Sequence, residues 1–361
     1  MSPWKKGLGL VLAVLIIALL SFAIRFSRAT SLFSTIEEVD ADCRLIEAAP
    51  GPEDIVIDRA RGFAYVSATD RRVLMAGGAD SASLRGGIYL IDLNAPPEEW
   101  ALVPVTPTSP ESFRPHGLGL FIDEEGTRSL FVVNHPAGGP DEVVILDVDE
   151  RGRLSHRRTV SDPLMANLND VQPVGADLFY ATNDHAVGTS EALQDFLMLD
   201  RTTLVYFDGT QVQIAAGGLT YANGVNASSD GKEIYVAETL DHALRVYRRN
   251  LDSGALELTE VVKLGTSADN IDVLKNGDLL IGAHPKILEF ADHAQDPDVL
   301  SPSQVIRVTR NEARDWSVQT LYLDKGDEVS GVAVAAGYRD VMLLGPVFQP
   351  RVMVCSQSSG R

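Results

Sequence analysis

Basic residues are scarce in this chain of 361 residues. Lysine and arginine number 31 against 50 aspartates and glutamates, so the formal net charge is −19. No excess positive charge is available to neutralise phosphates, and nucleic acid is therefore excluded as an expected partner. Most of the acidity is explained by carboxylates on a solvated surface, which keep the protein soluble. Carboxylates that do form a site would bind cations.

Several catalytic signatures are missing as well. The sequence has no GxSxG nucleophile elbow and no HExxH zinc motif. The glycine-rich stretch GGADSASLRGG at 77–87 lacks the Lys-Ser/Thr ending of a phosphate-binding loop, so we interpret it as a mobile surface loop. After residue 29 no long amphipathic helix is evident, and only 190–200 and 286–293 resemble short helices.

Long apolar runs are absent except at the N-terminus. Lys5 and Lys6 precede an apolar run from Gly7 to Ile24, which is about the length that crosses a bilayer. Residues 25–29 lack a clean small-x-small cleavage site, which favours a retained signal-anchor over a cleaved signal peptide. We therefore expect an anchor at 1–29 and an exported, periplasmic or extracellular domain at 30–361, which is secreted if the N-terminal segment is cleaved.

Cysteine is almost absent. Cys43 and Cys355 are the two cysteines, one shortly after the apolar run and one near the end of the chain. An exported protein permits a disulfide between them, which would join the two ends of the domain. The alternative is a pair of unrelated buried thiols.

A divergent internal repeat is what the sequence does contain. Each copy has a polar residue, then glycine or a small or second polar residue, then an aliphatic residue that opens a strand-like stretch. Copies recur about every 45 to 65 residues, and a second strand-like stretch follows each one. Six units of about four strands predict an all-β fold, a six-bladed β-propeller. The copies are Glu53-Asp54-Ile55, His116-Gly117-Leu118, Asn169-Asp170-Val171, Asn223-Gly224-Val225, Asp269-Asn270-Ile271 and Ser330-Gly331-Val332.

The polar residues of these repeats are expected to meet on one axis. The innermost strand of every blade lines the central tunnel of a propeller, so the strand starts converge there. Carboxylates buried on an axis require compensating charge, and a cation is the natural partner. Oxygen ligands from Asp, Glu and Asn suit Ca²⁺ better than Mg²⁺, and no cysteine cluster favours zinc. The alternative is a wet channel in which these side chains only hydrogen-bond.

Seven stretches resemble the paraoxonase (serum paraoxonase/arylesterase) family, in order and over essentially the whole chain. They are PEDIVID, RPHGLGLFID, LFVVNHP, NLNDVQPVGADLFYATNDH, YANGVNASSDGKEIYVAE, DNIDVLKNGDLLIGAHP and the terminal Cys355. The resemblance implies a six-bladed propeller with two calcium ions in its tunnel, a retained hydrophobic N-terminus and a disulfide between Cys43 and Cys355.

The resemblance also implies roles for individual residues. The catalytic calcium would be held by Glu53, Asn169, Asn223, Asp269 and Asn270. The structural calcium would be held by Asp54, Asp170 and the backbone carbonyl of Leu118. His116 and His135 correspond to a pair that activates water, and His185 and His284 to further histidines of the substrate pocket.

The expected function is calcium-dependent hydrolysis of carboxylic esters, with lactones and aryl esters as small-molecule substrates. Calcium would polarise the ester carbonyl while a neutral histidine accepts a proton from water. Calcium-bound water or a carboxylate such as Asp269 is an alternative base. Two other functions stay open: a gluconolactonase-type sugar-lactone hydrolase, and a calcium-stabilised propeller that binds without catalysis.

Overall fold

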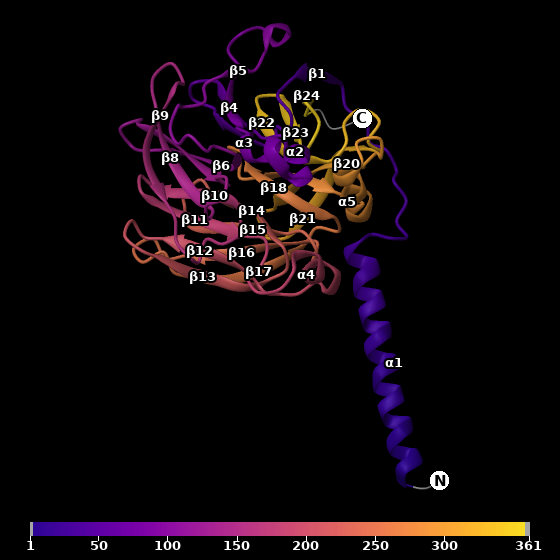
Figure 1. Cartoon of the computed structure of the whole chain (residues 1–361). Coiled ribbons are helices and arrows are strands. Elements are labelled where there is room, and N and C mark those ends of the chain that lie inside the picture. Colours follow the sequence, from indigo (N-terminus) through magenta and orange to yellow (C-terminus); the bar gives the residue numbers. More distant parts are fainter. Residues whose placement is uncertain (1–2, 358–361) are drawn as a thin grey trace.

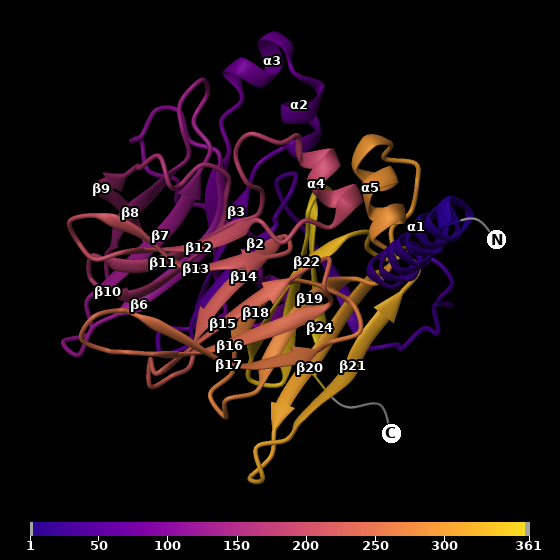
Figure 2. The ribbon, with the colours of Figure 1, turned by 90° about the horizontal axis from the view of Figure 1, so that it is seen from below.

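Six four-stranded antiparallel sheets form a ring in the computed structural model, which describes residues 3–357 (Figures 1 and 2). The first strands of the blades contact one another around the ring and line its central tunnel. The predicted six-bladed propeller is thus confirmed.

The strands have the following bounds, blade by blade. The first three blades are β2 (Asp54–Asp58), β3 (Phe63–Ala68), β4 (Gly87–Asp92) and β5 (Val103–Pro104); β6 (Pro115–Ile122), β7 (Arg128–Asn134), β8 (Glu142–Val148) and β9 (Leu154–Val160); β10 (Leu168–Gly175), β11 (Leu178–Asn183), β12 (Thr202–Phe207) and β13 (Val212–Leu219). The last three are β14 (Ala222–Ala227), β15 (Glu233–Glu238), β16 (Ala243–Arg249) and β17 (Leu256–Lys263); β18 (Ser267–Val273), β19 (Leu279–His284), β20 (Ser303–Arg310) and β21 (Trp316–Asp324); β22 (Val332–Tyr338), β23 (Val341–Pro346), β24 (Arg351–Ser356) and β1 (Cys43–Glu47).

The two ends of the propeller chain meet in the last blade. Strand β1 pairs antiparallel with β24, and Cys43 lies directly opposite Cys355 in that ladder. The two cysteines form a disulfide across a sequence separation of 312 residues, which confirms the predicted pairing. In the chain-entropy model, a cross-link that closes a loop of this length stabilises the folded protein by about 5 kcal/mol, because it restricts the unfolded chain.

Apolar side chains fill the space between neighbouring blades. Between the second and third blades, Phe131 of β7 meets Phe179 of β11 edge-on, with ring centroids 6.0 Å apart. Phe179 also packs on Phe207 of β12 at 5.2 Å. Because such packed interfaces separate all the blades, the starts of the innermost strands are held at fixed positions around the tunnel.

Short helices cover one end of the ring (Figure 2). Helix α4 (Glu191–Leu197) lies within the expected stretch 190–200, and α5 (Ile287–Gln295) overlaps the expected stretch 286–293 and extends two residues beyond it. The prediction of a mobile loop at 77–87 is wrong, because α2 (Arg71–Ala76) and α3 (Gly78–Ser83) occupy 71–83. The carboxylate of Asp70 caps the N-terminus of α2 by accepting the Val73 N–H at 3.1 Å. An aspartate before the first helical residue is a typical start signal, and it is the feature that could have predicted this helix.

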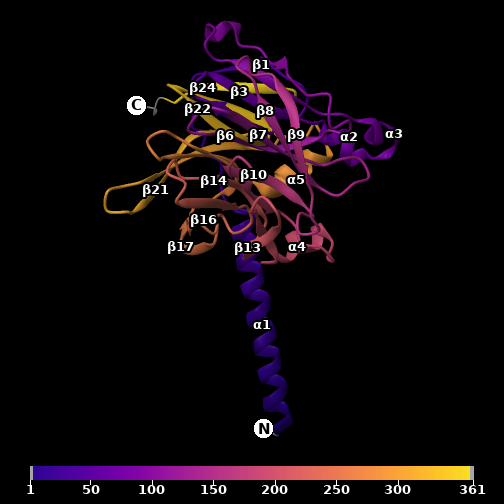
Figure 3. The same cartoon turned by 90° about the vertical axis from the view of Figure 1, so that its left-hand side faces the viewer.

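The N-terminal helix α1 (Pro3–Ala29) projects away from the propeller (Figures 1 and 3). Its stretch Leu10–Ala29 is long and apolar enough to cross a membrane. Its last turns touch the propeller: the rings of Phe22 and Phe26 lie 5.5 and 5.7 Å from that of Phe196 in α4. The helix ends at Ala29, and the anchor expected at 1–29, whose first two residues lie outside the described residues, stays a prediction.

Candidate active site

The repeated dipeptides of the sequence lie at irregularities in the innermost strands. Pairing between the first and second strands of a blade shifts between Pro115 and Leu118, and between Leu168 and Val171. The same shift occurs between Ala222 and Val225, and again between Ala268 and Ile271. A bulge takes two consecutive residues out of the ladder and re-aims their side chains. The four skipped dipeptides are His116-Gly117, Asn169-Asp170, Asn223-Gly224 and Asp269-Asn270.

Glycines in these dipeptides allow neighbouring blades to approach closely. A Cβ atom on Gly117 would lie 2.5 Å from the Cα of Asp170 in the next blade. A Cβ on Gly224 would lie 2.5 Å from the carbonyl oxygen of Asp269. Because no side chain fits there, glycine is required for the polar residues of adjacent blades to come together on the axis.

Three buried asparagines have their amide oxygens free. The Nδ2 of Asn169 donates to Asp184 at 3.2 Å, that of Asn223 to Thr239 Oγ1 at 3.1 Å, and that of Asn270 to Glu53 Oε1 at 2.8 Å. In each case Oδ1 is buried and accepts no hydrogen bond from the part of the chain that the structure describes. Buried acceptors without a donor are rare in proteins and fit ligands of a hard cation.

Negative charge is concentrated on the same axis. Glu53, Asp54, Asp170 and Asp269 are all at most 4% exposed. Burial raises the pKa of Asp54, Asp170 and Asp269, and repulsion from neighbouring carboxylates, Glu53 in every case, adds to the rise. Burial also acts upward on Glu53, but the neighbouring His116 and Arg71 outweigh it and lower that pKa to about 2. A cation among these carboxylates would relieve the repulsion.

Asp54 and Asp170 form a second, deeper set. Asp54 accepts the N–H groups of Ile55 at 2.7 Å and Leu118 at 2.6 Å, so it joins the first and second blades. Asp170 accepts those of Val171 and Val225, both at 2.7 Å, and joins the third and fourth. A cavity of about 300 Å³ lies beside both carboxylates. Leu118 contributes its N–H to Asp54, whereas metal ligation by its carbonyl stays a prediction.

The two predicted catalytic histidines are in contact. His116 Nδ1 lies 2.9 Å from His135 Nε2, and His116 Nε2 lies 3.5 Å from the carboxylate of Glu53. His135 Nδ1 lies 2.7 Å from Asp141 Oδ1. Asp141 was missed by the sequence reasoning, because it lies in the loop after β7 and outside the repeat pattern.

His284 and His185 occupy two other positions around the mouth of the tunnel. His284 Nε2 is 2.8 Å from Asp269 Oδ2, and its ring stacks on Phe290 of α5. His185 lies between Asp184 at 2.9 Å and Asp195 at 3.0 Å. Burial acts to lower the pKa of His185, but hydrogen bonds to the two aspartates raise it to about 10. His185 is therefore an imidazolium at neutral pH and ties α4 to the third blade.

Ser330 differs from the other repeat residues. It is buried just before β22, where its hydroxyl donates to the Gly326 carbonyl at 2.9 Å and accepts the Ser301 N–H at 3.2 Å. Both bonds stabilise the turn between the fifth and sixth blades. The expectation that Ser330 joins the polar ring is therefore not met, because its hydroxyl is used inside the turn.

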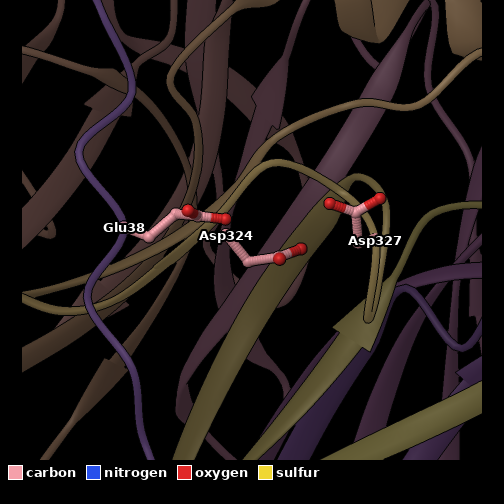
Figure 4. Close-up of side chains that lie close together, drawn as sticks. All are labelled: Glu38, Asp324 and Asp327. Atoms are coloured by element: carbon pink, nitrogen blue, oxygen red, sulfur yellow. The ribbon is translucent and has the colours of Figure 1, made fainter.

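One group of three carboxylates lies outside the tunnel. Glu38, Asp324 and Asp327 approach one another beside the segment that leads from α1 into the propeller (Figure 4). Lys325 already pairs with Glu38 at 2.8 Å, and Asp324 accepts the Gly326 N–H at 2.7 Å. The group thus has its own countercharge and lacks the free buried oxygens of the axis.

The fold and the side chains on its axis define a propeller with a cluster of buried oxygen donors and a histidine pair in its tunnel. A model of the arylesterase family matches residues 43–356, and the chain belongs to that family. It is 33% identical to rat serum paraoxonase/arylesterase 1 over 97% of this chain and 99% of the relative. It is also 33% identical to mouse serum paraoxonase/lactonase 3, over 94% of this chain and 95% of that relative.

Among solved structures, the chain resembles a putative gluconolactonase with a TM-score of 0.53 and 13% identity. The superposition covers 89% of this chain and 93% of the other. This likeness shows the shared propeller fold. The predicted family is confirmed by the relatives and the family model.

Proposed function

We propose that the chain is a calcium-dependent hydrolase of carboxylic esters that acts on lactones and aryl esters. The hydrolase class is supported by the arylesterase family and by relatives named arylesterase and lactonase. The observation that carries the calcium dependence is the set of three free, buried asparagine oxygens beside Glu53 and Asp269. An amide oxygen with no donor and a carboxylate are both ligands that Ca²⁺ prefers.

The donor set fits two ions. Glu53, Asn169, Asn223, Asp269 and Asn270 would hold the ion next to the substrate, since their oxygens lie at the histidine end. A second ion would be held deeper by the Asp54 and Asp170 carboxylates and by the carbonyl of Leu118. When bound near the substrate, calcium supplies a Lewis acid that polarises the ester carbonyl and stabilises negative charge on its oxygen.

The histidine pair supplies the proton transfers. His116 Nε2 faces Glu53 at the axis, where it would accept a proton from the water that attacks the carbonyl carbon. The same nitrogen would return that proton to the departing alkoxide or phenoxide oxygen. His135 holds the His116 ring from behind through the 2.9 Å contact between Nε2 and Nδ1. His284 holds Asp269, and His185 fixes α4 beside the mouth of the tunnel.

A non-catalytic binding propeller is less well supported. A purely structural ion would need only the deep pair, Asp54 and Asp170. The chain keeps in addition the five oxygen ligands at the histidine end and both histidines in hydrogen-bonding contact.

The direct test is hydrolysis of phenyl acetate, an aliphatic δ-lactone and D-gluconolactone by the full-length chain in detergent with calcium. We expect turnover of the first two, and replacing His116 by Gln should lower kcat by about 10²- to 10⁴-fold without changing the melting temperature. His156→Gln, on the exposed face of β9, is the matched control. Exclusive hydrolysis of gluconolactone would favour the sugar-lactone function. A folded protein that turns over none of the three substrates would favour the binding propeller.

We also propose that α1 anchors the exported domain in a membrane. The apolar stretch and the disulfide both suggest an exported protein. Retention of the full-length chain in membranes after alkaline carbonate washing is expected. Release of a chain that begins near residue 30 would instead indicate a cleaved, secreted form.

A further inference from the structure

Asp141 accepts a hydrogen bond with each of its carboxylate oxygens. Its Oδ1 lies 2.7 Å from His135 Nδ1, and its Oδ2 accepts the backbone N–H of Leu168 at 2.8 Å. The Asp141 side chain is only 16% exposed. It therefore connects the histidine pair of the second blade to the start of β10 in the third, one residue before Asn169.

We propose that Asp141 is the positioning residue that fixes the tautomers of His135 and His116. A carboxylate can only accept, so His135 must carry its proton on Nδ1. The Nε2 of neutral His135 is then an acceptor, and it takes the Nδ1 proton of His116 at 2.9 Å. The nitrogen of the pair without a proton is consequently His116 Nε2, which faces the axis; the nearest carboxylate, Glu53, lies 3.5 Å away and has Arg71 and Asn270 as its donors. This inference rests on the proposed role of His116 as the base.

Substituting Asp141 by Asn should reverse the chain of hydrogen bonds. The N–H of Leu168 can only donate, so the single oxygen of the Asn side chain would turn toward Leu168. The amide nitrogen would then donate to His135 Nδ1. His135 would in turn donate from Nε2 to His116 Nδ1, and His116 Nε2 would carry a proton and lose its capacity to act as a base.

Alanine at the same position has a different effect. It removes both acceptors but imposes neither tautomer, so part of the population keeps the free nitrogen at the axis. A merely structural role of Asp141 predicts the opposite order, because Asn preserves the volume and the Leu168 contact whereas Ala leaves a void. The relative damage caused by the two variants therefore distinguishes positioning from packing.

The experiment measures kcat and KM of the full-length calcium-loaded enzyme for a δ-lactone in both variants. We expect Asp141→Asn to lower kcat by about 10²-fold or more with little change in KM, and to lose more kcat than Asp141→Ala. Asp147→Asn is the control, since this aspartate lies on β8 and is 49% exposed. Wild-type kcat in Asp141→Asn, or greater damage by Ala, would overturn the proposal.

A second measurement does not depend on activity or on the folding of a variant. Long-range ¹H–¹⁵N spectra of histidine-labelled wild-type protein report which ring nitrogens carry protons. The proposal is supported if, in both His116 and His135, Nδ1 carries the proton and Nε2 carries none. The reverse pattern in either ring contradicts it. Because the spectra need no substrate, they test the tautomers even if the protein hydrolyses no ester, which would remove the proposed function alone.

Discussion

Arg71 brings a positive charge to the histidine end of the tunnel, beside the buried carboxylate of Glu53. Its guanidinium lies 3.3 Å from Glu53 Oε2 and 3.2 Å from the carbonyl of Gly51. Burial lowers the pKa of Arg71, whereas Glu53 and Asp269 act in the opposite direction. Arg71 is thus an internal countercharge for Glu53 and competes with a cation for the same carboxylate.

Replacing Arg71 by Met should therefore have opposite effects on stability and on calcium binding. Without calcium, the buried charge of Glu53 loses its arginine partner and keeps only His116 and Asn270, and the free energy of unfolding should fall by about 3–5 kcal/mol. With calcium bound, the ion supplies the missing charge, so the loss should be smaller and calcium affinity higher. Thermal melts with and without calcium, together with calorimetric titration, measure both quantities.

Arg72→Met provides the control for this prediction. Arg72 follows Arg71 in α2 but donates to the carbonyl of His293 and lies 4.5 Å from the ring centroid of Phe348. An equal loss of stability in Arg71→Met with and without calcium would show that Arg71 does not share Glu53 with the ion.

The innermost strands carry the site because they are irregular at one place. In four blades the ladder skips the two residues of the repeat dipeptide, and in two of those blades a glycine lies against the backbone of the next blade. The blade interface and the ligand positions are consequently coupled. A change in the spacing of two strands should therefore also change the cation site.

Gly224→Ala tests this coupling between β14 and β18. The new Cβ would lie 2.5 Å from the Asp269 carbonyl oxygen and 2.8 Å from the Asn270 Cα, so the strands must separate. We expect a loss of about 1–3 kcal/mol in stability and weaker calcium binding. Gly217→Ala is the control, because its nearest neighbour is Thr203 Cγ2 at 3.9 Å. Unchanged calcium affinity in Gly224→Ala would disprove the coupling.

The sequence predicts the regular part of this arrangement and misses its local exceptions. Repeats of strand-like stretches indicate the propeller, and equivalent strand starts bring Glu53, Asn169 and Asp269 together by symmetry. Asp141 follows no repeat, because it reaches the site from a loop and only the folded chain brings it there. Helix α2 was not predicted because it is short and is followed by the glycine-rich stretch at 77–87, which favoured a loop over a helix capped by Asp70.

The ring closes through its own chain ends, and the helices of one end surround the mouth of the tunnel. Strand β1 completes the last blade, and the disulfide joins β1 to β24. The segment after α1 is attached to the end of the ring that carries the short helices, because Lys286, just before α5, donates to the carbonyl of Ser31 at 2.8 Å. Closure makes every blade depend on its neighbours, so the strand starts of the first five blades are held at fixed positions around the tunnel.

Hydrolysis should require a cation held by these strand starts. The measurement is δ-lactone turnover by the full-length chain with calcium, after chelation by EGTA, and after calcium is restored, with circular dichroism recorded at each step. We predict that turnover disappears with EGTA and returns with calcium but not with magnesium at the same free concentration. An unchanged rate in folded, calcium-free protein would show that hydrolysis needs no cation.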